Sequence, residues 1–394
     1  MAGPAFGANS RDALRKVLLE LLAGRTPALV MTLDGEAWRE IQRLAALHRL
    51  EPLLHYCAAG NEAVPAEIRD AWRKSFSFSA FTALQLAGEL ATTTAILQQA
   101  GHAPIALKGA WLAWHAYPHP ALRPMRDIDL WLPDGDAAAA HSLLVSRGYA
   151  PEGAAQQSFE QSFALDKHLP PLRSPRGVRI ELHHRLWEVD GRMDHAAPAA
   201  TETAIRRRAV RIGNIAYLDP QDTLAHLIIH AVYDHRLDCG PLLLSDVSFL
   251  LQRTVIDWDR FWHDAEDDGW ERGAALVLQM VREHAPDAAA PPTPKNFALP
   301  DGIGTALLLQ ELDTRQSAGV VATLKAGGLR AFLLRICARR HANGGTPITR
   351  DLNSEGGFVA WARNRLVRTV QDLARQDVRR QASTLATLSR WLDG

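Results

Sequence analysis

Pro104–Pro133 has the sequence PIALKGAWLAWHAYPHPALRPMRDIDLWLP, and this stretch decides the fold. Its first apolar residues predict a short strand over residues 104–108, followed directly by a helix. The alternating run over residues 127–132 predicts a second strand, in which every other side chain is apolar. Asp127 and Asp129 therefore lie together on the polar face of that strand.

Two carboxylates on one strand face repel each other unless a cation or a proton lies between them. A divalent metal ion resolves this repulsion, because Mg²⁺ prefers hard oxygen ligands. Pairs of metal ions held in this way serve phosphoryl transfer. We interpret Asp127 and Asp129 as metal ligands. The alternative is a strand face that is simply exposed to water.

A third carboxylate lies on the polar face of a further predicted strand, Val178–Trp187, with the sequence VRIELHHRLW. If this strand is adjacent to residues 127–132, Glu181 converges with the two aspartates on one patch. Three carboxylates around two metal ions suit the transfer of a nucleotidyl group. Alternatively, Glu181 forms a surface ion pair with Arg179 or Arg185.

Lys108 and Gly109 lie at the predicted turn from the first strand into the helix. Glycine permits a close approach of the backbone to a phosphate, and a helix N-terminus favours anions. Lys108 adds a full positive charge at the same turn. Arg123 and Arg126 precede the second strand, where they either bind a substrate phosphate or balance the aspartates.

Three histidines allow more than one interpretation. His183 follows Glu181 by two residues and either orients that carboxylate or is an ordinary surface histidine. His226 and His230 are four residues apart in a predicted helix, a spacing that can bind zinc, so a zinc hydrolase is a third functional alternative. Packed histidines are favoured, because the surrounding sequence is apolar and no glutamate follows His226. His230 and Asp246 are candidates to line a cleft beside the core.

The composition is that of an ordinary soluble protein, with 47% hydrophobic and 22% charged residues and a net charge of zero. Global charge therefore gives no argument for a nucleic-acid or membrane partner. Cys57, Cys239 and Cys337 form no CxxC pair, which fits a reducing compartment. No stretch resembles a signal peptide or approaches the ~20 apolar residues of a membrane span. We expect a cytoplasmic protein.

Changes in the spacing of apolar residues divide the chain into regions. Apolar residues at helical spacing dominate both ends of the chain, and strand patterns dominate between them. The expected regions are an N-terminal helical region (1–100), a small mixed α/β core (101–219), a helical region packing on the core (220–285), a Pro/Ala-rich linker (286–300) and a C-terminal helical region (301–394). The last helix carries a run of arginines that is either a solvated face or a surface for an anionic partner.

The motifs KG, DID and ELH, in this order and at these spacings, resemble the bacterial nucleotidyltransferase family 5, a branch of the polymerase-β-like superfamily. The resemblance extends over residues 10–285. It implies an α+β fold, with a small mixed-sheet polymerase-β-like nucleotidyltransferase core between N-terminal and C-terminal helical regions. Members occur among natural-product and polysaccharide biosynthesis genes, which implies a small-molecule, peptide or glycan acceptor rather than a polynucleotide.

The resemblance also implies roles for individual residues. It assigns catalysis and the binding of Mg²⁺ or Mn²⁺ to the three carboxylates Asp127, Asp129 and Glu181. It assigns contacts with the triphosphate to Lys108, Gly109 and Arg123. The implied activity is metal-dependent transfer of a nucleoside monophosphate from an NTP to the acceptor, with release of pyrophosphate.

One position departs from the superfamily pattern. Polymerase-β-like enzymes usually have Gly-Ser after the first strand, with the serine on the triphosphate, whereas this chain has Gly109-Ala110. The hydroxyl is missing, and Lys108 has to serve the triphosphate instead. This departure supports the alternative function, a non-catalytic nucleotide- or partner-binding module on a degenerate nucleotidyltransferase scaffold.

Overall fold

The computed structural model describes residues 11–152, 166–187, 199–285 and 374–393, with short pieces between 297 and 371. Most of the predicted linker 286–300 and of the predicted helical region 301–394 lies outside the described residues. The same holds for Cys337 and for the first part of the strand predicted over residues 159–172.

The N-terminal part of the chain is helical, as the apolar spacing predicts. Asp34 caps the second helix by accepting a hydrogen bond from the backbone N–H of Ala37. Pro65 directly precedes the longest helix, where proline is a common start signal. The elements are α1 (Arg11–Leu22), the 3₁₀ helix η1 (Ala28–Thr32), α2 (Gly35–Leu47), α3 (Glu51–Cys57) and α4 (Ala66–Gln99).

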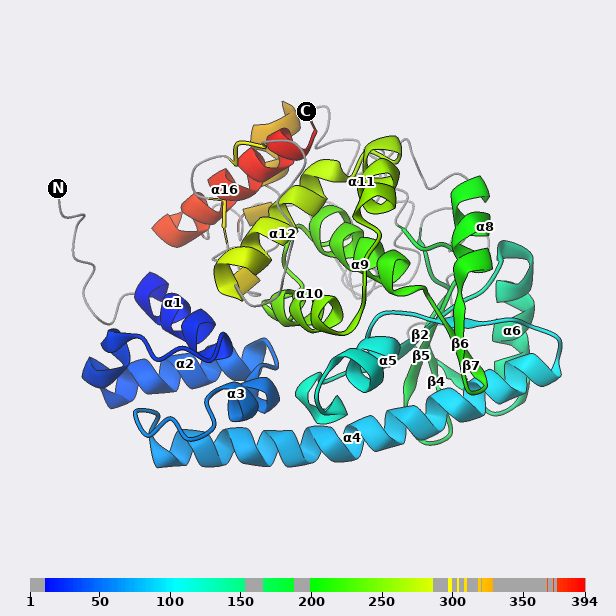
Figure 1. The fold of residues 1–394 in the computed structure, drawn as a ribbon, viewed down its shortest axis with the longest axis horizontal. Helices are drawn as coiled ribbons and strands as arrows, with labels where there is room; N and C mark the ends of the chain where they lie inside the picture. Colours follow the sequence, from blue (N-terminus) through cyan, green and yellow to red (C-terminus); the bar gives the residue numbers. More distant parts are fainter. Residues whose placement is uncertain are drawn as a thin grey trace.

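Helix α4 joins this helical part to the sheet. Its 34 residues make a rod about 50 Å long. Figure 1 shows α4 running beneath the other N-terminal helices at one end and along the sheet at the other. Helix α4 thus contacts both the N-terminal helix α3 and the core elements η3 (Pro120–Leu122) and α6 (Asp134–Ser146).

In the part of the core that the structure describes, seven short strands form a mixed sheet in the order β3-β4-β5-β2-β1-β7-β6. The pairs β2–β5 and β1–β7 are parallel, and the other neighbours are antiparallel. The strands are β1 (Ile105–Ala106), β2 (Asp127–Trp131), β3 (Ala150–Pro151), β4 (Leu172–Arg173), β5 (Arg179–His183), β6 (Val210–Ile212) and β7 (Ile215–Tyr217). The α+β fold class predicted from the sequence is confirmed.

Short helices connect these strands. The predicted helix after β1 is α5 (Gly109–Trp111), which continues as a π-helical turn, η2 (Leu112–Ala116). The 3₁₀ turn η3 (Pro120–Leu122) and the helices α6 (Asp134–Ser146) and α8 (Ala199–Arg208) complete the core.

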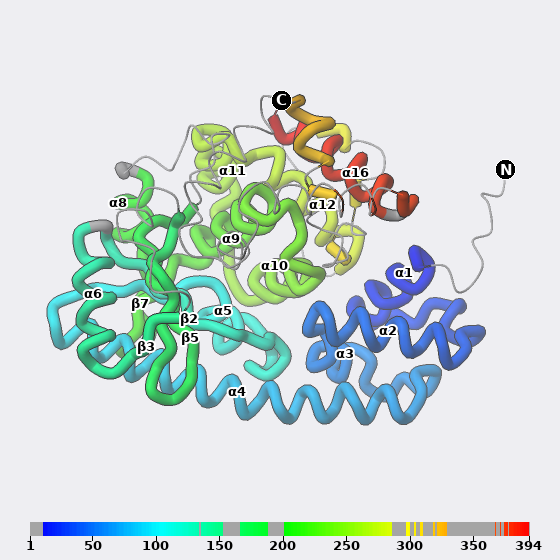
Figure 2. Tube along the Cα trace, turned by 180° about the vertical axis from the view of Figure 1, so that it is seen from behind, coloured from blue at the N-terminus to red at the C-terminus, as the bar shows by residue number. Residues whose placement is uncertain are grey.

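A second group of helices follows the core. It comprises α9 (Pro220–Ile229), the π-helical turn η4 (His230–Asp234), α10 (Leu242–Arg253), α11 (Trp258–Asp267), α12 (Glu271–His284) and, near the C-terminus, α16 (Gln376–Leu392). Helix α10 packs against η2, while α4 packs against η3. Figures 1 and 2 show the α5–η2 segment between α10 on one side and α4 on the other. In the described part of the chain, no helix combines the length and apolarity needed to cross a membrane.

Two buried histidines in the helical parts make stability depend on pH. Burial lowers the pKa of His48 and of His284 to about 4. As the pH falls below 6.5, the unfolded chain takes up protons at these positions while the folded protein does not. Stability should therefore be lost between pH 6.5 and 4, with about 1 kcal/mol per histidine gone at pH 5.5.

Urea denaturation at pH 7.5 and at pH 5.5 measures this loss. The variant His48→Gln has no titrating group at this position, so its stability should differ less between the two pH values. A pH dependence that is equal in the variant and in the wild type would contradict the assignment to His48.

Candidate active site in the cleft beside the sheet

The three predicted carboxylates come together on adjacent strands. Strands β2 and β5 are parallel neighbours, and Asp129 is the register partner of Glu181. Asp127 lies two residues before Asp129 on the same strand face. The expectation that these strands are neighbours is confirmed, and it brings Asp129 and Glu181 side by side. In the described part of the chain, the group of ligand atoms that lie within 4.8 Å of one another consists of Asp129, Glu181 and His183 and does not include Asp127.

Asp129 is held from two sides. The Lys108 ammonium lies 3.2 Å from its Oδ2 atom, and His183 donates from Nε2 to its Oδ1 atom over 2.9 Å. Burial alone would raise the pKa of Asp129, but Lys108 and His183 hold it well below the ordinary value. Burial lowers the pKa of His183 to about 3, so its ring is neutral at pH 7. Asp129 is therefore ionised in the folded protein.

Asp127 has the opposite electrostatic environment. Burial, followed by the charges of Asp129 and Glu181, raises its pKa to about 6. The nearby Lys108 and Arg179 offset only part of this effect. The cluster therefore has a surplus of negative charge, which is the condition that favours binding of a cation.

The donor atoms of this cluster fit a divalent metal ion. One ligand atom each from Asp129, Glu181 and His183 lie within 4.8 Å of one another. The Nδ1 atom of His183 is buried and has no hydrogen-bond partner. His183 thus contacts the carboxylate cluster directly, where the sequence suggested that it orients Glu181. The alternative ion pair of Glu181 is also present, since Arg179 lies 2.8 Å from its Oε1 atom.

Lys108 adopts an unusual backbone conformation at the turn after β1. Its backbone φ angle is +46°, a value that residues other than glycine rarely adopt. This turn directs its ammonium group to Asp129, so Lys108 neutralises one carboxylate of the cluster. The next residue, Gly109, begins α5.

Gly109 provides room for an arginine. A Cβ atom at this position would collide with Nη1 of Arg123 and would lie 2.8 Å from Sδ of Met125. The sequence suggested that Gly109 admits a phosphate, but the groups nearest to its backbone here are the side chains of Arg123 and Met125. Arg123 thereby lies at the turn that was predicted to bind phosphate.

Arg123 also anchors the second group of helices. Its Nε and Nη2 atoms donate to the two carboxylate oxygens of Asp246 on α10, over 2.8 and 2.9 Å. The Tyr117 hydroxyl donates to the same carboxylate over 2.7 Å. Burial would lower the pKa of Arg123, but Asp246 raises it above the ordinary value. A charged pair buried in this way fixes α10 relative to the turn at Gly109.

The variant Gly109→Ala should lower the free energy of unfolding by about 1–3 kcal/mol, because the added methyl group displaces Arg123 and Met125. Gly135→Ala in α6 is the matched control, since nothing lies within 4 Å of its added Cβ atom. That change should be neutral or stabilise the protein by up to about 1 kcal/mol. Urea denaturation compares the two, and equal stabilities would contradict the close packing at Gly109.

The cluster opens into a cleft with a volume of about 400 Å³. Its lining includes all six site residues predicted from the sequence, together with His230 and Asp246. Four further polar residues line it that sequence reasoning missed: Arg49, Lys167, His168 and His235. Lys167 is nearly fully buried and binds Asp234 at 2.5 Å and His230 at 3.2 Å.

The two histidines with zinc-like spacing are packed rather than paired as ligands. Their rings stack with centroids 6.0 Å apart, and His226 also packs against Trp187. Nδ1 of His230 lies 3.2 Å from Asp234. In the described part of the chain, the group of residues suited to a metal contains neither histidine.

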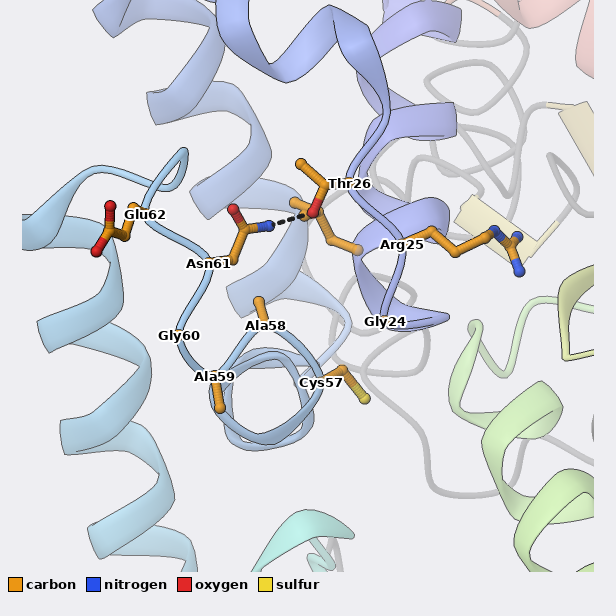
Figure 3. A pocket seen from close by; sticks show the side chains of 10 residues that line it. Gly24, Arg25, Thr26, Cys57, Ala58, Ala59, Gly60, Asn61 and Glu62 are labelled. Carbon is orange, nitrogen blue, oxygen red and sulfur yellow. Dashed lines mark hydrogen bonds between the residues drawn. The ribbon is translucent and has the colours of Figure 1, made fainter.

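A second hollow, of about 470 Å³, lies in the N-terminal helical part (Figure 3). Its walls come from the loop after α1 and the loop between α3 and α4, and Asn61 donates to Thr26 across it. Arg25 at its edge is already bound by Glu20 and by the carbonyl of His284. Burial raises the pKa of the Cys57 thiol to about 12, which makes it unreactive. This hollow lacks the grouped carboxylates of the cleft.

Comparison with known proteins agrees with the geometry of the cleft. No curated protein and no solved structure matches the chain. Residues 34–286 match the model of a protein family described as uncharacterised nucleotidyltransferases. This segment contains β2, β5 and all the residues of the carboxylate cluster. The protein therefore belongs to this family of uncharacterised nucleotidyltransferases.

Proposed function

We propose that the protein transfers a nucleoside monophosphate from an NTP to a hydroxyl, phosphate or carboxylate group of an acceptor. The acceptor oxygen forms a bond to the α-phosphorus, the bond to the β-phosphate oxygen breaks, and pyrophosphate leaves. The observation that supports this reaction best is the cluster of Asp127, Asp129 and Glu181 on paired strands, facing one cleft in a nucleotidyltransferase-family chain.

Asp129 and Glu181 would hold Mg²⁺ or Mn²⁺ together with Asp127, which lies on the same face of β2. When bound, the metal supplies charge stabilisation to the phosphates and a lowered pKa to the attacking group. Lys108 already neutralises Asp129 and is placed to move from this carboxylate to a phosphate oxygen of the substrate. His183 keeps Asp129 oriented by its hydrogen bond.

The remaining walls of the cleft suit the selection of the acceptor. Lys167, which is paired with Asp234, and His230 come from outside the carboxylate strands and line the same cavity. A volume of about 400 Å³ accommodates a small ligand beside a nucleotide phosphate tail rather than a nucleic-acid duplex. We therefore propose a small molecule, a peptide end or a glycan as acceptor.

The second candidate is a nucleotide- or partner-binding module without turnover. It is favoured by one observation, the buried Ala110 in the place of the serine that polymerase-β-like enzymes usually carry. In that case the cleft binds a nucleotide, and no product forms.

Calorimetric titration with each of the four NTPs tests the proposed binding. At least one NTP should bind in Mg²⁺ and lose its affinity in excess EDTA. The variant Asp127→Asn/Asp129→Asn should behave in Mg²⁺ as the wild type does in EDTA. NTP binding that is unaffected by both changes would remove the basis for placing the reaction at this cluster.

A further inference from the structure

Arg49 lies at the cleft although it belongs to the N-terminal helical part of the chain. It follows α2 and lines the same cavity as the carboxylate cluster and Arg126. The sequence predicts only an N-terminal helical region over residues 1–100. The position of this guanidinium therefore needs its own explanation.

Three other cations of the cleft each have a carboxylate partner. Lys108 is bound to Asp129 and Lys167 to Asp234, as Arg123 is to Asp246. For Arg49 and Arg126, no ion pair is found with any residue that the structure describes. The only described hydrogen bond of the Arg49 side chain goes to the carbonyl of Pro124, at the long distance of 3.5 Å.

The backbone of Arg49 is in a conformation that favours glycine. Helix α2 ends in a Schellman motif, in which the N–H of Leu50 donates to the carbonyl of Ala45 and the N–H of Arg49 to that of Ala46. Arg49 occupies the left-handed position of this motif, with φ of +57°. Glycine is the usual residue there, because a Cβ atom strains this conformation. Arg49 therefore stands at a position where the backbone conformation favours glycine.

The surroundings of the guanidinium add a second unfavourable contribution. Burial, followed by repulsion from Arg126 and Arg123, lowers the pKa of Arg49 to about 10. The charges of Asp127 and Asp246 offset only part of this effect. The left-handed backbone, the burial of the guanidinium and the two neighbouring arginines are each unfavourable for Arg49. Such a cluster of like charges is relieved when an anion binds between them.

We propose that Arg49 and Arg126 form a phosphate-binding subsite at the mouth of the cleft. Arginine suits this role because its planar fork of donors matches two phosphate oxygens. The source of the phosphate rests on the proposed function: it is either the β- and γ-phosphates of the NTP or a phosphate group of the acceptor. The N-terminal helices thus contribute a substrate-binding residue to the site.

Two variants of Arg49 separate binding from folding. Arg49→Gly removes the charge and relieves the backbone strain, so its melting temperature should equal or exceed that of the wild type. Arg49→Lys keeps a positive charge but loses the fork. Arg73→Gln on the exposed surface of α4 removes one arginine charge that is not part of the cleft lining and is the control.

Calorimetry with inorganic tripolyphosphate in Mg²⁺ is the first readout. If the subsite holds the NTP tail, Arg49→Gly should weaken tripolyphosphate binding at least about tenfold, Arg49→Lys less, and Arg73→Gln not at all. If it holds an acceptor phosphate, tripolyphosphate binding stays unchanged. In that case the binding of inorganic phosphate to the protein saturated with a non-hydrolysable NTP analogue should weaken instead.

Unchanged affinity of Arg49→Gly for both probes would overturn the subsite, as would a wild type that binds neither probe. A loss of affinity together with a lower melting temperature in Arg49→Gly would also overturn it, because Arg49 would then have a structural role. The proposed function can fail independently of the subsite. If the wild type binds tripolyphosphate through Arg49 but transfers no nucleotide, the phosphate-binding subsite is supported and the proposed reaction is not.

Discussion

Asp127→Asn should stabilise the protein in EDTA and at the same time weaken the Mn²⁺ binding that we propose for the carboxylate cluster. Burial and the charges of Asp129 and Glu181 raise the pKa of Asp127 to about 6, so its ionised form opposes folding above that pH. Removing the charge should raise the free energy of unfolding at pH 7.5 by about 1–3 kcal/mol in EDTA. The gain should disappear as the pH approaches 3.8, where the carboxyl group is protonated in both states.

The same change removes a proposed metal ligand. Mutation of residues that merely support a ligand weakens metal binding 10- to 100-fold, so loss of Asp127 itself should weaken Mn²⁺ binding at least about 100-fold. Urea denaturation and calorimetry with Mn²⁺ measure the two effects on one protein preparation. Asp70→Asn, at an exposed carboxylate on α4, should change neither quantity.

Asp129→Asn serves as the internal comparison, because the pKa of Asp129 is shifted in the opposite direction to that of Asp127. Lys108 and His183 hold the pKa of Asp129 well below its ordinary value, so its charge stabilises the fold above pH 3.8. The variant Asp129→Asn should therefore lose stability while it also loses Mn²⁺ affinity. If both asparagine variants changed stability in the same direction, the electrostatic description of the cluster would be wrong.

Asp246→Ala should lower the free energy of unfolding by about 3–5 kcal/mol. Asp246 is 6% exposed and binds both Arg123 and Tyr117, so its removal leaves a buried guanidinium without a counter-charge. Urea denaturation at pH 7.5 measures the loss. Asp70→Ala at an exposed ion pair should stay within about 0.5 kcal/mol of the wild type.

A double variant tests the cause of this destabilisation. Arg123→Met combined with Asp246→Leu replaces the buried pair with apolar side chains and should recover most of the lost stability. No recovery would mean that Asp246 acts through Tyr117 or through the packing of α10 rather than through its charge pair with Arg123.

The parts of the site that lie on strands could be predicted from the sequence, because the alternation of side chains is a local property. The run 127–132 gave the face of Asp127 and Asp129, and β5 lies within the predicted strand Val178–Trp187. Sequence alone left open whether these strands are neighbours, which depends on the pairing in the whole sheet. The structure supplies that pairing.

The rest of the cleft depends on contacts between residues far apart in the chain. Arg49 and Lys167 carry no periodic signal, and they reach the cleft only because whole elements pack there. Arg49 occupies the position after α2 where glycine is the usual residue, and this is visible only once the end of the helix is known. The division of the chain at residues 100, 219 and 285 likewise stays a prediction.

At the turn after β1, the position of the KG motif could be predicted from the sequence, but its contacts could not. Lys108 and Gly109 lie at the predicted place, yet Lys108 binds a carboxylate and Gly109 accommodates Arg123. Both contacts involve residues from other segments of the chain. Local spacing identified the residues and could not identify these partners.

Transfer of label from an NTP tests the central claim most directly. Each of the four NTPs, labelled at the α-phosphate, is incubated with the protein, Mg²⁺ or Mn²⁺ and a cell extract as the source of acceptor. We expect one NTP to give a labelled product with the wild type and none with Asp127→Asn/Asp129→Asn. Equal labelling by the wild type and the double variant, or no labelling together with no metal-dependent NTP binding, would contradict nucleotidyl transfer at this cluster.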